Sequence, residues 1–386
     1  MTSVSMAGVH IPERAAERAA ISWVIPAAVI ATTSIVVGVI WDISWHRTIG
    51  RDTFWTPAHL AIYLGGVLAG LSGAWLILKT TFGPEAERTT GVRVWGFRGP
   101  LGAWIAIWGA TAMVTSAPFD DWWHNAYGLD VKILSPPHAV LGMGMITIQI
   151  GILMLALSHQ NRATPRQRML LGGVFAYTLG ALLALLSTVL MEQTVPHARH
   201  QASFYLVLAG VFLLFIVAAS RASFLRWPAT AAAGVYMGIC AAMSWILPLF
   251  RAQPLLGPIF NPVDHMVPPP FPMLLIVPAV FVDLLMQRVR GRDGWLSVAL
   301  GATFVWVLFD VEWWFAEFMV GPYSRNAFFA AQRWGYNIRL TPAILEFWGQ
   351  TTNPVTVPAM AMATLVGIAA ARLALGWGNW MRRVVR

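Results

Sequence analysis

The chain has 386 residues, of which 57% are hydrophobic and only 11% are charged. A soluble globular domain needs about a quarter charged residues to cover its surface, so this composition excludes that class and indicates a membrane protein. The formal charge of +9 does not indicate a nucleic-acid partner, because the basic residues stand in short connections between apolar runs.

Apolar runs of about 20 residues, long enough to cross a hydrocarbon core of about 30 Å, recur along nearly the whole chain. We predict an all-α, polytopic transmembrane helical bundle of about ten spans built from hairpins, forming a single integral membrane domain over residues 1–386. The first apolar run is expected to be a retained helix, because it lacks a signal-peptide cleavage pattern. The predicted spans are 20–43, 57–79, 100–119, 137–158, 169–191, 201–220, 228–249, 270–287, 295–318 and 355–376.

The distribution of basic residues predicts the orientation of the bundle. Of the 26 Lys and Arg residues, 18 stand on the side of the amino terminus and 8 on the opposite side. By the positive-inside rule, both termini are cytoplasmic. We therefore expect an integral protein of the bacterial inner (plasma) membrane, in contact with lipid, whose other connections face outward.

The first predicted hairpin, residues 20–79, carries a candidate metal site at its outward end. Asp42 and His46 are four residues apart, hence on one face of a helix, and His59 opens the returning helix just after Pro57. A hairpin joins adjacent antiparallel helices, so these three side chains can converge. Two histidines and one carboxylate form a metal site with open positions for water, dioxygen or substrate.

The second predicted hairpin, residues 100–158, repeats this arrangement with Asp120, His124 and His138. Asp121 is an alternative carboxylate that lacks the matching spacing. A single Asp/His pair at a helix end is more often a salt bridge or a cap, but two copies at matching topological positions favour metal binding. The sequences at the returning helices, Trp-Thr-Pro-Ala-His-Leu and Leu-Ser-Pro-Pro-His-Ala, are also alike and indicate a duplicated hairpin.

The remaining spans, residues 169–376, contain weaker candidates. The segment near 305–320 resembles the second hairpin around Phe309 and Asp310, with an aromatic residue in place of the histidine, so this degenerate copy is expected to bind no metal. A third cluster would form if the outward connections pack together, and the alternative is that its members pair with Arg199 or Arg251. Its members would be Glu192, His197, His200 and His265.

At the two hairpins the sequence resembles the copper-dependent membrane monooxygenases, the particulate methane and ammonia monooxygenase family, and specifically their C subunit. The resemblance covers about residues 35–150 and consists of the spacings D-x3-H-x12-H and D-x3-H-x13-H. Asp120 stands where the family subunit has Asn. The added negative charge favours a harder or divalent ion, such as iron or zinc, at the second site.

The resemblance implies copper near the outer membrane face and oxygen activation beside an aromatic and apolar pocket. The function expected from it is a metal-dependent membrane oxidoreductase, similar to a monooxygenase, that activates dioxygen to oxidise a small apolar substrate. The sequence has no counterpart of the family's cupredoxin-like B subunit, so other membrane or periplasmic subunits, or a homo-oligomer, are expected partners.

Two alternatives to an enzyme remain at this level. A non-catalytic protein could collect copper or zinc at the outer face for a partner, or assemble a complex, although the 17 Met residues lie mostly inside spans and disfavour a carrier. A proton or solute pathway is the third interpretation, but transporters usually place their polar groups near the membrane midplane.

Overall fold

The computed structural model of the chain describes residues 23–50, 52–84, 91–128, 135–255, 263–289, 293–332 and 353–384. About 78% of it is helical, which confirms the all-α class. In the described residues the sheet is a single antiparallel hairpin of β1 (Val92–Val94) and β2 (Phe97–Gly99) between the second and third long helices.

The helices follow the predicted spans in chain order. The first half contains α2 (Val24–Thr48), α3 (Pro57–Phe82), α5 (Leu101–Tyr127), α6 (Pro136–Arg162) and α7 (Pro165–Val189). Two short turns, α8 (Met191–Thr194) and η1 (Pro196–Ala198), lead to a continuous span made of α9 (Ala202–Val207), the π-helical η2 (Leu208–Phe212) and α10 (Leu213–Ala222). The rest comprises α11 (Pro228–Ile246), η3 (Leu247–Leu249), α12 (Ile276–Arg288), α13 (Asp293–Val320), η4 (Pro322–Ser324) and α15 (Val357–Met381).

Eight helical segments in the described residues are long and apolar enough to cross a membrane. Two of the ten predicted spans are not among them. Helix α5 is 27 residues long, but its last turns are polar, whereas α12 has only 13 residues, or about 20 Å at 1.5 Å per residue. Helix α12 starts late because Pro268, Pro269, Pro270 and Pro272 precede it, and proline lacks the N–H that a helix interior requires. The number ten stays a prediction.

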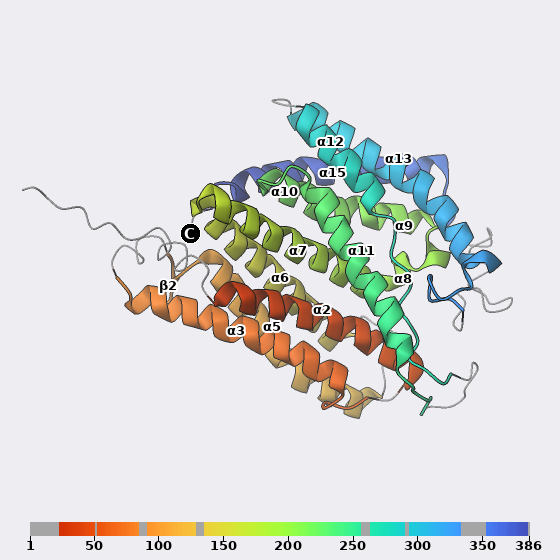
Figure 1. Cartoon of the computed structure of the whole chain (residues 1–386), viewed down its shortest axis with the longest axis horizontal. Helices are drawn as coiled ribbons and strands as arrows, with labels where there is room; N and C mark the ends of the chain where they lie inside the picture. The colour runs from red at the N-terminus through yellow and green to blue at the C-terminus, as the bar shows by residue number, and fades with distance from the viewer. Residues whose placement is uncertain are drawn as a thin grey trace, which may run out of the picture.

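The first four long helices form two antiparallel hairpins that lie against each other. Helix α2 packs on α3 and α5 packs on α6, while α3 also contacts α5 and α6 contacts α7. In Figure 1 these hairpins occupy one side of the molecule, and α12, α13 and α15 lie on the other. The carboxyl-terminal ends of α2 and α5 and the beginnings of α3 and α6 are therefore close to one another.

Glycines allow the two helices of the second hairpin to approach closely. A Cβ atom on Gly144 would lie 2.8 Å from the carbonyl oxygen of Gly109, and one on Gly109 would lie 2.6 Å from the carbonyl oxygen of Gly144. Small residues at such contacts are a common means of packing helices in membranes. This contact fixes α5 and α6 relative to each other below the second Asp/His group.

The carboxyl terminus lies at the opposite end of the bundle from the Asp/His groups. The side-chain amide of Asn161, near the end of α6, donates hydrogen bonds to the carbonyl oxygens of Arg382 and Val384 at 3.2 and 2.7 Å. His138 stands at the other end of α6, about 34 Å away at 1.5 Å per residue. The Asp/His groups and the end of α15 are thus on different sides of the span.

Candidate metal centres

The first Asp/His group forms where α2 ends and α3 begins. The Nε2 atom of His59 lies 3.1 Å from Oδ1 of Asp42, and Nε2 of His46 lies 3.8 Å from Oδ2 of the same carboxylate. Asp42 and His46 stand one helical turn apart, and proline at position 57 starts α3 so that His59 falls in its first turn. The structure therefore brings together the three residues singled out from the sequence.

Asp52, from the connection between α2 and α3, is a fourth member that our sequence reasoning missed. Its Oδ2 atom lies 3.4 Å from Nε2 of both His46 and His59. Burial by itself would raise the pKa of the Asp52 carboxyl, but the hydrogen bond and charge of His46 outweigh it and hold the pKa below its usual value of 3.8. Asp52 is therefore a charged oxygen donor at neutral pH.

A sequence signal for Asp52 exists in the duplication. The spacing from His46 to Asp52 is six residues, and the same spacing in the second hairpin leads from His124 to Asp130. Asp130 lies outside the described residues. Both hairpins share the pattern D-x3-H-x5-D. A comparison of this whole pattern, including the aspartate that follows the first histidine, would have indicated a second carboxylate.

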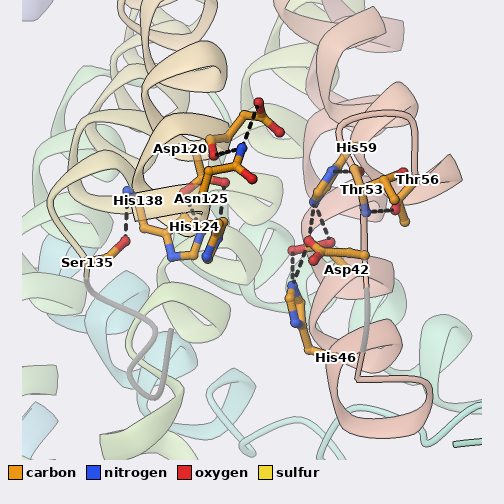
Figure 2. A network of polar contacts seen from close by, with 12 residues as sticks. Asp42, His46, Thr53, Thr56, His59, Asp120, His124, Asn125, Ser135 and His138 are labelled. Carbon is orange, nitrogen blue, oxygen red and sulfur yellow. Dashed lines mark hydrogen bonds and ion pairs between the residues drawn. The ribbon is translucent and has the colours of Figure 1, made fainter. Parts of the chain in front are cut away.

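The second group repeats the geometry of the first. Nε2 of His138 lies 3.2 Å from Oδ1 of Asp120, and Nε2 of His124 lies 3.5 Å from Oδ2 of Asp120. The hydroxyl of Ser135 caps α6 by accepting a hydrogen bond from the backbone N–H of His138 at 3.4 Å. In Figure 2 the two groups lie side by side, each with its histidine rings directed at a central carboxylate.

Backbone carbonyl groups set the tautomer of one histidine in each group. Nδ1 of His59 lies 2.9 Å from the carbonyl oxygen of Thr53, and Nδ1 of His124 lies 3.2 Å from that of Gly128. A carbonyl oxygen only accepts, so Nδ1 carries the hydrogen in both contacts. In the neutral ring Nε2 then has a lone pair, and this lone pair faces a carboxylate. Such an arrangement requires a proton or a metal ion between the two acceptors.

One carboxylate oxygen in each group lacks a hydrogen-bond donor. Oδ1 of Asp42 and Oδ1 of Asp120 are buried atoms without a hydrogen-bond partner. An unsatisfied buried carboxylate oxygen is costly, and a bound cation would remove that cost. The same atom is affected in both hairpins, so a cation at the equivalent position would stabilise either group.

The spacing of the donor atoms fits a transition-metal ion. Metal bonds of 2.0–2.2 Å to His nitrogen and carboxylate oxygen place tetrahedral ligands about 3.3–3.6 Å apart. The measured separations run from 3.1 to 3.8 Å. Within the described part of the chain, the sets of three or more His, Cys, Asp or Glu side chains close enough to share an ion are these two groups.

The remaining candidate ligands lie elsewhere. Asp121 is exposed and lies outside the second group. The side-chain amide of Asn125 donates hydrogen bonds to its backbone carbonyl oxygen and to its carboxylate. His200 stacks on Trp313, with ring centroids 3.7 Å apart, and His265 pairs with Asp264 at 2.8 Å. Five additional candidates come from the sequence: Asp121, Glu192, His197, His200 and His265. None of them belongs to either metal-binding group found among the described residues.

The segment near residues 305–320, interpreted from the sequence as a degenerate repeat, contributes to a buried ion pair. Nη1 of Arg199 lies 2.8 Å from Oε2 of Glu312, and both side chains are at most 1% exposed. Arg199 also donates to the carbonyl oxygens of Thr194 and Phe271, at 3.0 and 3.2 Å. The guanidinium supplies the positive charge beside this carboxylate, whereas Asp310 is exposed.

A cavity of about 450 Å³ lies between the two Asp/His groups. It is bounded by the start of α3, the end of α5 and the connection that carries Asp52. The volume is within the range of about 300–1,000 Å³ typical of small-molecule sites. Its lining residues are Asp52, Thr53, Phe54, His59, Tyr63, Ala117, Asp120, Asp121, His124 and Asn125.

The fold and these groups define a class: a helical membrane protein with two hairpin-borne sets of Asp and His side chains able to hold metal ions. No protein-family model, curated protein or solved structure matches the chain.

Proposed function

We propose that this protein is a metal-dependent membrane oxidoreductase, similar to a monooxygenase, which activates dioxygen at its Asp/His groups and oxidises a small substrate. The observation that carries the proposal is the matched pair of donor sets. In each hairpin a histidine Nε2 atom lies 3.1–3.2 Å from a buried carboxylate oxygen that receives no hydrogen bond. This is the arrangement expected of a preorganised metal site.

The bound ions would supply redox chemistry and an open coordination position for dioxygen. The protein's own residues then have separate tasks. Thr53 and Gly128 hold the rings of His59 and His124 through their carbonyl oxygens, and α2 and α5 place each aspartate one turn before its histidine. A monooxygenation also consumes two electrons and two protons, because one oxygen atom enters the substrate and the other leaves as water. An external electron donor is therefore part of the proposal.

The identity of the metal is proposed in two parts. We propose copper for the first group on the strength of its D-x3-H-x12-H pattern. Iron and zinc are alternatives, above all for the second group. Asp52 makes the first donor set two carboxylates and two imidazoles. Oxygen and nitrogen donors of this kind suit divalent ions better than copper(I), so the proposed copper is copper(II) in the resting protein.

The placement in the cell belongs to the same proposal. We place both groups at the outer face of a bacterial inner membrane and both termini in the cytoplasm, on the strength of the basic residues on the opposite side. The absence of a cupredoxin-like segment from the sequence argues that electrons arrive through another subunit or through a second copy of the chain.

A non-catalytic role in metal handling is the second candidate. It is favoured by the position of the groups at the end of the bundle, where 35% of the His46 side chain is exposed, so an ion could be passed to a partner. The two candidates differ in turnover, because a carrier binds metal without consuming dioxygen.

Metal analysis of the detergent-purified protein tests both candidates. We expect about two ions per chain in the wild type and about one fewer in Asp42→Ala and in His124→Ala, with Asp121→Ala as the matched control that keeps both. An equal metal content in the wild type and the two ligand variants would contradict metal binding altogether. If the ions bind, dioxygen consumption with short alkanes, ammonia or alcohols separates the oxidoreductase from the carrier.

A further inference from the structure

Residues of both Asp/His groups line the cavity between the two hairpins. The first group contributes Asp52 and His59, and the second contributes Asp120 and His124. The other three members, Asp42, His46 and His138, do not line it. Each group therefore presents one edge to the same cavity.

The packing of the helices also brings the two groups together. Helix α3, which carries His59, packs against α5, which carries Asp120 and His124. A molecule that fills the cavity would therefore contact both groups.

About half of the cavity wall is polar. Carboxylate, amide, hydroxyl and imidazole groups make up this half, and the aromatic rings of Phe54 and Tyr63, with centroids 5.1 Å apart, belong to the apolar half. An occupant must therefore satisfy hydrogen-bonding groups as well as fit beside the rings. A saturated hydrocarbon would leave these polar groups without partners, whereas a small polar molecule would not.

We propose that this cavity is a single ligand site shared by the two metal sites, and that it takes a small polar molecule in contact with both ions at once. The inference rests on the proposed function for the presence of the ions. It adds that the two hairpins act on the same molecule and that the duplication of the hairpin built a site between its copies.

Azide, a small anion that coordinates copper(II), is the probe for this inference. The copper(II)-loaded protein is titrated with azide and followed by electron paramagnetic resonance and by the ligand-to-metal absorption band. A shared site binds one azide per chain, and the signals of both ions change together with one affinity. Two azides per chain, each changing one signal, would overturn the proposal.

Ala117→Trp is designed to fill the cavity without removing a metal ligand. We expect copper content to remain as in the wild type and azide affinity to fall at least tenfold at both ions. Ala112→Trp is the matched control, because Ala112 is also a half-buried residue of α5 but does not line the cavity. Its azide affinity should equal that of the wild type.

Tyr63→Trp, which changes a lining residue on α3, provides a second cavity-filling variant if Ala117→Trp loses its copper. Wild-type azide affinity in a copper-loaded cavity variant, or a loss at only one ion, contradicts the shared site. Failure of the wild type to bind copper, iron or zinc would instead contradict the proposed function, so the two failures are distinguishable.

Discussion

Asp52 and His46 lie in contact, with Oδ2 of the carboxylate 3.4 Å from Nε2 of the ring. They come from different segments, since His46 is in the last turn of α2 and Asp52 is in the connection that follows it. The contact adds a second carboxylate to the first Asp/His group and converts a three-residue pattern into a set of four donors. Its consequence is testable through metal affinity.

Asp52→Asn is expected to weaken metal binding at the first group by tenfold or more, because it removes a charged donor and leaves a neutral amide oxygen. The second group should keep its affinity. Titration of the metal-free protein with copper(II) against a competing chelator measures the change. Asp121→Asn, which alters a nearby carboxylate outside the groups, should bind as the wild type does. Equal affinities in Asp52→Asn and the wild type would exclude Asp52 as a ligand.

Metal affinity should decrease as the pH falls through the range in which histidine side chains gain a proton, because this proton competes with the ion. Asp52 should add little to this loss. Its pKa lies below 3.8, so its carboxylate stays charged, and available to the ion, until the pH falls through that lower value. Chelator competition between pH 5 and pH 8 checks the expectation. An affinity independent of pH over this range would argue against imidazole ligands.

Arg199→Met should destabilise the protein by about 3–5 kcal/mol, since it leaves the carboxylate of Glu312 buried without its partner. The double variant Arg199→Met with Glu312→Gln should recover part of this loss, because no unpaired charge remains. Thermal unfolding in detergent ranks the stabilities of the wild type, the single variant and the double variant. Metal content should stay unchanged in any variant that remains folded, because this ion pair is separate from both Asp/His groups.

Gly144→Val should separate α5 from α6 and reduce metal binding at the second group more than at the first. A side chain at this position would meet the backbone of Gly109 at 2.8 Å and the side chain of Met113 at 2.9 Å. Gly142→Val is the matched control on the same helix, because a Cβ atom there meets nothing within 4 Å. Metal content and melting temperature of the two variants give the comparison. Equal loss in both would show that valine in α6, rather than the helix contact, is responsible.

The sequence by itself determined the helices and the three-residue core of each group. Apolar runs of membrane-spanning length require helices, since every backbone polar group must be satisfied within the segment. Two residues four apart share a helix face, and a hairpin returns its next helix to the same end. Asp42, His46 and His59 were therefore accessible from spacing alone, as were their counterparts in the second hairpin.

Only the tertiary structure decided the position of Asp52, the cavity between the hairpins and the partner of Glu312. A connection between helices has no periodicity, so the direction of Asp52 depends on the path of that particular backbone. The cavity depends on how α3 packs on α5, and the pair of Arg199 with Glu312 joins residues 113 positions apart. Contacts of this kind are set by packing between elements, which local spacing does not encode.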